Sequence, residues 1–236
     1  MMKPLDKTIE IFDQQYQDLG MQAQRAYPNE FLIQFVASRY FGIPQADRKN
    51  IRILEVGCGS GANLWMLSKE GFDTYGIDSS QIGIDLAAQH LRVKWGVEAD
   101  LQKGSFTQLP YNDAFFDAVV DVVSLECINL HDSHLALQEI HRVLKPEGVF
   151  FSYRLSDHSI MYEHAKGGRI DAATVDNIAD TTLPLANNGP VTFWSPSLTR
   201  MMYQKASLDV DAIALIGRTY SSGSYVEYLA ITGIKN

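Results

Sequence analysis

Cysteine is scarce in this chain of 236 residues, which contains only Cys58 and Cys127. Two cysteines are too few for the disulfide scaffold that stabilises many small secreted domains. The N-terminal stretch MMKPLDKTIEIF also lacks the apolar centre of a secretory signal, because acidic and basic residues interrupt it at once. These two absences predict a cytoplasmic protein.

Long hydrophobic runs and basic clusters are missing as well. No segment approaches the roughly 18 consecutive apolar residues that a membrane-spanning helix needs. The sequence has 20 Lys and Arg against 28 Asp and Glu, a net charge of −8, which is the wrong sign for binding nucleic acid phosphates. The densest basic segment, DRKNIR at 47–52, is better interpreted as solvated surface. We therefore expect neither a membrane nor a nucleic acid partner.

Apolar residues make up 46% of the chain, enough for one substantial core and marginal for two. Short apolar runs typical of strands alternate with segments whose apolar residues lie three and four apart, as in helices. This alternation indicates an α/β fold with a doubly wound, mostly parallel sheet. We expect helices at 8–19, 29–41, 61–70, 81–93, 134–144 and 197–207, and strands at 51–56, 72–78, 117–124 and 148–155.

The C-terminal part departs from this alternation. Two extended runs, 210–217 and 225–234, are separated by RTYSSGS, whose Gly and Ser content suits a hairpin. An antiparallel strand pair is therefore expected to close one edge of the sheet. Residues 156–196 are less regular and contain several Gly, Asn and Pro, so we interpret them as an insertion over one face.

A glycine-rich segment, ILEVGCGSG at 53–61, includes the first predicted strand and the turn after it. Ligands of parallel α/β sheets bind at the carboxyl ends of the strands, where glycines let the backbone approach a bound molecule. Gly57, Gly59 and Gly61 have the spacing G-x-G-x-G, whereas dinucleotide-binding folds use G-x-G-x-x-G. Taken alone, this spacing also suits an ordinary tight turn between a strand and a helix.

Two acidic residues strengthen the ligand interpretation. Glu55 lies inside the strand, where an unpaired carboxylate is costly, and a cationic ligand group such as an ammonium would explain it. The alternative is a bond to backbone amides or to Arg52. Asp78 ends the second strand, 21 residues (78 − 57) after the first glycine, where an acid binds the ribose hydroxyls of adenosine-containing ligands. It could instead cap the next helix, although Ser79 and Ser80 already suit that role.

Three blocks of the sequence resemble the class I S-adenosylmethionine-dependent methyltransferases: ILEVGCGSGANLWMLSKEGFDTYGIDSS, LPYNDAFFDAVVDVVSLECI and HRVLKPEGVFFS. The resemblance covers about residues 52–155. It implies a Rossmann-like sheet of seven strands with the last one antiparallel, S-adenosylmethionine as cofactor and S-adenosylhomocysteine as product. The cofactor-binding residues that it implies are Glu55, Gly57, Cys58, Gly59, Gly61, Asp78, Ser79, Ser105, Phe106, Ser124 and Leu125, the stretch from Ser124 passing near the sulfonium.

By the same resemblance, the three glycines line the methionine part of the cofactor, Glu55 orients its ammonium, and Asp78 holds the ribose. Ser79 lies near the adenine edge. Many relatives carry an Asp before the LP dipeptide that accepts a hydrogen bond from the adenine amino group, and here KGSFTQLP places Ser105 there. A hydroxyl accepts less strongly than a carboxylate. Either Ser105 and the Phe106 backbone suffice, or the affinity for the cofactor is modest.

Methyl transfer by in-line displacement depends mainly on alignment and on exclusion of water. A hydroxyl acceptor must also lose a proton, and histidine is suited to remove it near neutral pH. His131 and His134, just after the fourth strand, are the candidate catalytic residues. For each histidine taken singly a structural role is favoured, and for His134 that role is a place in the following helix. An acceptor amine that is already neutral needs no base. The HDSH pair has no further placed ligands, so no metal is predicted, and Cys127 is interpreted as a small core residue.

The methyl acceptor is expected to be a small molecule, bound by the parts of the chain outside the shared core. Aromatic rings with a few cations suit a small anionic or sugar-like acceptor. The alternative is that half of these side chains are surface residues or belong to the core of the cap. The candidate substrate-binding residues are Tyr16, Tyr27, Arg154, Tyr162, Trp194 and Arg200.

Together, these interpretations predict a single domain over 1–236, acting as a monomer or homodimer. Its parts are a helical N-terminal lid (1–46), a cofactor-binding core (47–155), a substrate-cap insertion (156–196), and a final helix with the strand pair (197–236). The predicted function is methyl transfer to a hydroxyl or amine of a small molecule. Two other classes stay open: a methyltransferase-like protein that binds the cofactor without turnover, and a nucleotide-dependent oxidoreductase, which the glycine spacing disfavours.

Overall fold

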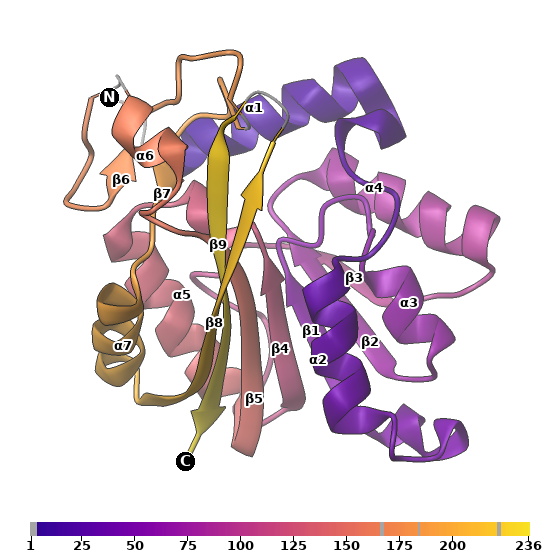
Figure 1. Cartoon of the computed structure of the whole chain (residues 1–236). Helices are drawn as coiled ribbons and strands as arrows, with labels where there is room; N and C mark the ends of the chain where they lie inside the picture. Colours follow the sequence, from indigo (N-terminus) through magenta and orange to yellow (C-terminus); the bar gives the residue numbers. More distant parts are fainter. Residues whose placement is uncertain (1–3, 166–167, 184, 221–222) are drawn as a thin grey trace.

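The computed structural model of this chain describes residues 4–165, 168–183, 185–220 and 223–236. Its centre is a seven-stranded sheet in the order β3-β2-β1-β4-β5-β9-β8 (Figure 1). The first five strands in this order are parallel, whereas β9 runs antiparallel to both of its neighbours. The strands are β1 (Arg52–Val56), β2 (Asp73–Asp78), β3 (Asp100–Lys103), β4 (Phe116–Val122), β5 (Leu144–Leu155), β8 (Leu208–Thr219) and β9 (Tyr225–Lys235).

The order of the strands reverses at β1. This strand pairs in parallel with β2 on one side and with β4 on the other, with Glu55 opposite Gly76 and Val120. In a doubly wound sheet, the crevice beyond the carboxyl ends of the strands at such a reversal is the usual ligand site. The fold therefore directs attention to the turns that follow β1, β2 and β4.

Helices cover both faces of the sheet, and most begin at a side chain that caps the first turn. Asn29, Ser80, Asn129 and Ser195 each accept a hydrogen bond from a backbone amide two or three residues further on. The helices are α1 (Pro4–Leu19), α2 (Glu30–Tyr40), α3 (Leu64–Lys69), α4 (Gln81–Gln89), α5 (Leu130–Val143), α6 (Ile160–His164) and α7 (Pro196–Lys205).

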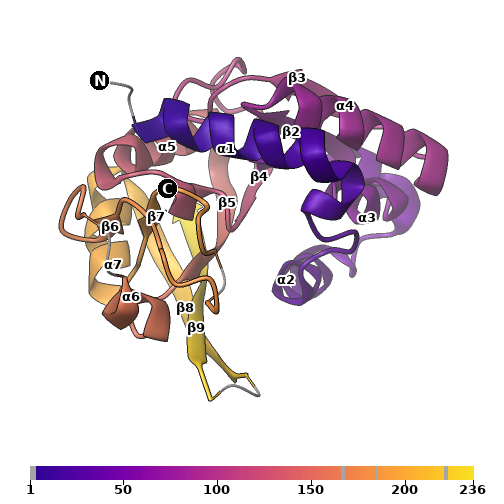
Figure 2. The ribbon, with the colours of Figure 1, turned by 90° about the horizontal axis from the view of Figure 1, so that it is seen from above.

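The two faces have separate apolar cores. On one face, residues of α5 and α7 such as Leu137 and Tyr203 pack with Phe150 of β5. On the other face, residues of α2 and α3 such as Phe35 and Leu67 pack against β1, β4 and β5. The helix α1 covers neither face in this way but lies across the end of the sheet at which β1, β2 and β4 finish (Figure 2). This position makes α1 a wall of any site at that end.

The expected doubly wound, mostly parallel seven-stranded sheet is confirmed, and so is the antiparallel pair at its edge. The sequence analysis missed β3, a strand of only four residues near the opposite edge. It also ended the fifth helix too late and began the following strand too late, because β5 starts at Leu144 and runs through Pro146. Of the connection between β8 and β9, residues 221–222 lie outside the described part.

The irregular segment 156–196 contains α6 and a two-stranded antiparallel sheet of β6 (Thr174–Val175) and β7 (Val191–Thr192). It has an apolar core of its own, in which Met161, Ile178 and Phe193 are buried with Val226 of β9. The segment is therefore packed onto the end of the β8–β9 pair through side chains as well as through its backbone.

Candidate active site

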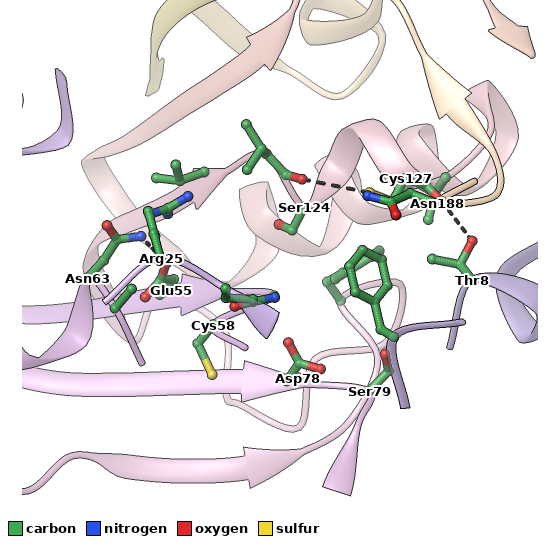
Figure 3. A pocket seen from close by; sticks show the side chains of 18 of the residues that line it. Thr8, Arg25, Glu55, Cys58, Asn63, Asp78, Ser79, Ser124, Cys127 and Asn188 are labelled. Atoms are coloured by element: carbon green, nitrogen blue, oxygen red, sulfur yellow. Dashed lines mark hydrogen bonds between the residues drawn. The ribbon is translucent and has the colours of Figure 1, made fainter. Parts of the chain in front are cut away.

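A cavity opens at the carboxyl ends of β1, β2 and β4, at the reversal of strand order (Figure 3). Its volume is about 230 Å³, somewhat below the roughly 300–1,000 Å³ usual for small-molecule sites. The lining residues are Thr8, Phe12, Tyr16, Gln24, Arg25, Glu55, Gly57, Cys58, Ala62, Asn63, Asp78, Ser79, Phe106, Val122, Val123, Ser124, Cys127, Ile128, Leu185 and Asn188.

The turn after β1 exposes backbone to this cavity. Gly57 has a φ of +67°, and its amide donates a hydrogen bond to the carbonyl of Ile77 on β2. A Cβ added to Gly57 would lie 2.3 Å from the Cβ of Ser124, so the two turns meet here without room for a side chain. Gly59, with a φ of +49°, donates its amide to Asp78. Glycine is needed at both positions because L side chains rarely adopt this conformation.

Glu55 is buried beside this turn, with a side chain that is only partly satisfied. Asn63 donates a hydrogen bond to its Oε1, whereas Oε2 has no partner among the described residues. Burial raises the pKa of Glu55 to about 8, and the bond from Asn63 and the charge of Arg25 only partly oppose this rise. Arg25 and Asn63 flank Glu55 in the cavity (Figure 3). A ligand cation at Oε2 would complete the coordination of the carboxylate.

Asp78, at the end of β2, holds two backbone turns at once. Its Oδ2 accepts the amide of Gly59 at 2.8 Å, and its Oδ1 accepts the amide of Ser80 at 2.9 Å. Burial raises the pKa of Asp78 above its usual value, against the lowering effect of these bonds. Each carboxylate oxygen has two lone pairs, so both oxygens can still accept hydroxyl donors from a ligand in the cavity.

The remaining wall is mostly apolar. Phe12 and Tyr16 come from α1, Val123 and Ile128 come from the segment after β4, and Leu185 comes from the insertion. The hydroxyl of Tyr16 accepts a hydrogen bond from Gln24, and burial raises the pKa of Tyr16 well above its usual value. This phenol therefore keeps its proton at neutral pH and cannot serve as a base.

Comparison with known proteins identifies this architecture. The family model described as "Methyltransferase domain" matches residues 54–152, which include β1, β2, β4 and most of β5. Residues 54–152 therefore form a class I S-adenosylmethionine-dependent methyltransferase domain. The matched residues include neither α1 nor the insertion at 156–196.

The curated relatives match about half of this chain. The Sterol 24-C-methyltransferase of Neurospora crassa is 32% identical over 136 residues, which are 55% of this chain and 35% of that protein. The chain thus spans about a third of that relative. An S-adenosylmethionine-dependent methyltransferase of Methanosarcina mazei has a TM-score of 0.66 at 20% identity, over 78% of this chain and 92% of its own.

The fold by itself does not determine the reaction. The structure of the [4+2]-cyclase SpnF has a TM-score of 0.68 to this chain at 17% identity, over 96% of this chain and 94% of its own. At this identity the likeness concerns the fold alone. The chemistry of this chain must therefore be argued from the residues of its own cavity.

The residues of the cavity fit the cofactor that the family uses. The unpaired, buried Oε2 of Glu55 suits an ammonium, the free lone pairs of Asp78 suit ribose hydroxyls, and the turn at Gly57 presents backbone instead of side chains. Seven of the eleven residues implied by the resemblance line the cavity: Glu55, Gly57, Cys58, Asp78, Ser79, Phe106 and Ser124.

The other four lie near the cavity but do not line it. Gly59 faces Tyr16 and Gln24, and Gly61 faces Leu91 and Ala87, so Gly61 allows helix packing rather than ligand approach. Ser105 exchanges a hydrogen bond with the Thr107 hydroxyl, and Leu125 is fully buried.

The two candidate catalytic histidines are not part of the lining. His131 is exposed and His134 half-buried, and both lie on the first two turns of α5. None of the described residues that line the cavity is a histidine. The alternative role of His134, membership of the helix after the fourth strand, agrees with its position.

Of the candidate substrate-binding residues, only Tyr16 lines the cavity. Tyr27 is 62% exposed and lies edge-on to two tryptophan rings, Tyr162 packs on Phe193, and Arg200 is exposed on α7. Arg154 and Trp194 are fully buried against each other. For these five residues the structure gives no support to the predicted contact with substrate, because none of them lines the cavity.

Sequence reasoning missed several lining residues. Thr8 and Phe12 of α1, and Leu185 and Asn188 of the insertion, reach the cavity only because two distant segments converge on it. Cys127, expected in the core, is buried yet lines the cavity as well. Asn63 could have been predicted, since it follows the glycine turn and the buried Glu55 needs a hydrogen-bond donor nearby.

Two negative findings complete the description. Within the described residues, no three His, Cys, Asp or Glu side chains are grouped closely enough to hold a metal ion. None of the helices in that same part of the chain has the length and apolar character to cross a bilayer.

Proposed function

We propose that this chain transfers a methyl group from S-adenosylmethionine to a small molecule with a largely apolar body, leaving S-adenosylhomocysteine. The observation that carries the proposal is the buried, half-satisfied Glu55 beside the side-chain-free turn at Gly57. Bound there, S-adenosylmethionine would supply an electrophilic methyl group. The chain itself would supply orientation and a cavity from which water is excluded.

The apolar part of the lining supports an apolar acceptor. It is built from Phe12, Phe106, Val123, Ile128 and Leu185, and Arg25 is the one cation among the described lining residues. A sterol methyltransferase among the relatives fits this character. An anionic or sugar-like acceptor finds less support.

The lining also favours one kind of atom as the one that receives the methyl group. A hydroxyl needs a base near the reacting oxygen, and Tyr16 is held protonated while the carboxylates of Glu55 and Asp78 serve the cofactor side. A nucleophile that reacts without first losing a proton, such as a neutral amine, fits these side chains better than a hydroxyl.

Calorimetric titration with S-adenosylhomocysteine, with NADH as a control ligand, tests the proposal. We expect binding of S-adenosylhomocysteine alone, weakened at least tenfold in Asp78→Asn, because an amide nitrogen cannot accept from the Gly59 or Ser80 amide. Asp73→Asn, at the exposed start of the same strand, should bind as the wild type does.

Turnover is tested by release of S-adenosylhomocysteine with a panel of apolar amines and alcohols of matched chain length. Binding without turnover of any acceptor would favour a cofactor-binding protein that does not catalyse methyl transfer. Failure to bind S-adenosylhomocysteine would contradict the proposal as a whole.

A further inference from the structure

The turn after β4 forms part of the cavity wall in a strained conformation. Val122, Val123 and Ser124 all line the cavity. Val123 has a φ of +59°, and a β-branched residue in the left-handed region is a clear outlier that the surrounding structure must hold in place.

Asp121 holds this turn from behind. Its Oδ1 accepts the amides of Ser124 and Leu125, each at 3.1 Å, and the Ser124 hydroxyl at 2.5 Å. The same hydroxyl also contacts the carbonyl of Val56 at 2.8 Å. Asp121 thereby sets how closely Ser124 approaches the glycine turn after β1.

Arg154 of β5 lies behind Asp121 and is fully buried. Its Nε is 3.4 Å from Asp121 Oδ2 and donates to the hydroxyl of Ser152, which in turn donates to Asp121 Oδ2 at 2.6 Å. Its guanidinium lies 4.2 Å from the ring centre of Trp194. Its two terminal nitrogens have no hydrogen-bond partner among the described residues.

A buried cation with two unused donor nitrogens is a poor way to stabilise a core. Breaking or desolvating such pairs is costly, and packed apolar residues of similar volume often serve stability as well or better. Glu126, whose Oε1 is buried without a partner among those residues, is a second carboxylate that the charge of Arg154 attracts. The arrangement is better explained by what the charge of Arg154 does to Asp121.

We propose that Arg154 is a positioning residue for methyl transfer, which pairs with the carboxylate of Asp121 and so fixes the strained Val123–Ser124 wall against Gly57. The inference rests on the proposed function. Trp194, whose amide donates to the carbonyl of Leu155, belongs to the insertion. Arg154 therefore also connects the insertion to the wall of the cofactor site.

The test compares three variants of the full chain, and a fourth as a control, by their dissociation constants for S-adenosylhomocysteine, measured by calorimetry. Arg154→Met leaves Asp121 buried and unpaired, and we expect at least tenfold weaker binding. Arg154→Lys keeps the charge and should stay within about fivefold of the wild type. Asp121→Asn with Arg154→Met removes both charges but keeps an amide oxygen for Ser124 and Leu125, so binding should recover to within about threefold. A tenfold change in the dissociation constant corresponds to about 1.4 kcal/mol.

Arg48→Met is the matched control. Arg48 is also buried and ion-paired, to Glu70, but lies away from the cavity. We expect it to lower the thermal midpoint without changing the affinity for S-adenosylhomocysteine.

The amide proton shifts of Ser124 and Leu125, measured by NMR in the free protein, give a readout that needs no ligand. Both should move upfield in Arg154→Met and return in Arg154→Lys. Unchanged shifts, or affinities that follow thermal stability across all variants including Arg48→Met, would overturn the role of Arg154. A wild-type protein that fails to bind S-adenosylhomocysteine but shows the expected shifts would instead overturn the proposed function, and with it the link to methyl transfer.

Discussion

At Gly57, two requirements coincide in one residue. The backbone has a φ of +67°, and a Cβ there would collide with Ser124. Gly96 has a similar φ of +60°, but no atom lies within 4 Å of the position of its missing Cβ. Comparing substitutions at Gly57 and Gly96 therefore separates the cost of the left-handed backbone from the cost of a steric clash.

We therefore expect Gly96→Ala to lower the free energy of unfolding by about 1 kcal/mol, the usual penalty for the left-handed conformation. Gly57→Ala should cost more and should also abolish binding of S-adenosylhomocysteine, because the turn after β4 must move. Urea unfolding and calorimetry measure the two effects. Equal losses of stability with intact binding in Gly57→Ala would show that the turns adapt freely.

Glu55 provides a second prediction at this scale. Its pKa of about 8 means that the free protein carries a proton there at pH 7. An ammonium beside Oε2 favours the charged form, so binding of S-adenosylhomocysteine at pH 7 should release about one proton. Calorimetry in buffers of different ionisation enthalpies measures this number.

Glu55→Gln, which cannot ionise, is the control and should release no proton from this site. Release should also decrease in the wild type as the pH is raised above 8, because Glu55 is then already ionised. A wild-type protein that binds at pH 7 without releasing protons would refute the pairing of Glu55 with the ligand ammonium.

Among the elements, α1 stands apart because it is held mainly by polar contacts at its surface. Lys7 forms an ion pair with Asp176, Asp13 accepts the hydroxyl of Ser80, and Gln15 donates to Asn188. A half-exposed ion pair such as Lys7–Asp176 contributes little to stability. Only Thr8 and Tyr16 are buried among the α1 residues whose exposure is described.

We accordingly expect the amides of α1 to exchange hydrogen much faster than those of β4 in the free protein, since weakly packed elements open locally. S-adenosylhomocysteine should slow exchange in α1, because Phe12 and Tyr16 line the cavity. Hydrogen exchange followed by mass spectrometry measures both rates. If α1 is as protected as β4 without ligand, it does not act as a lid.

For the whole molecule, the buried carboxylates determine how stability depends on pH. Burial raises the pKa of both Glu55 and Glu126 to about 8. Between their ordinary value near 4.5 and pH 8, the folded chain binds more protons at these two sites than the unfolded chain does, so stability falls as the pH rises. Glu139, Asp171 and Glu227 have lowered pKa values and act in the opposite direction, mainly below that window.

Glu126→Gln should therefore flatten the decline in the free energy of unfolding between pH 5 and pH 8, since glutamine keeps an oxygen for the Leu155 amide but cannot ionise. Urea unfolding of the wild type and this variant at several pH values gives the difference, in which all other groups cancel. Parallel curves for the two proteins would show that Glu126 ionises without penalty.

The sequence by itself determined the features that depend on neighbours in the chain. Alternating apolar patterns specify the strands and helices of the core, and the glycine spacing, Glu55 and Asp78 specify one side of the site because they lie on adjacent strand ends. The strand β3 escaped detection since four residues with little burial carry almost no pattern.

Only the tertiary structure decided what Gly61, Arg154 and the two histidines do. Gly61 belongs to the same motif as Gly57, yet it faces Leu91 and Ala87, because direction in space and not spacing decides what a glycine meets. Arg154 is a candidate substrate-binding residue in the sequence but lies buried beside Trp194. One wall of the cavity comes from α1 and the insertion, which are separated by more than a hundred residues. Contacts between segments so distant depend on how the whole chain packs, and no local pattern encodes them.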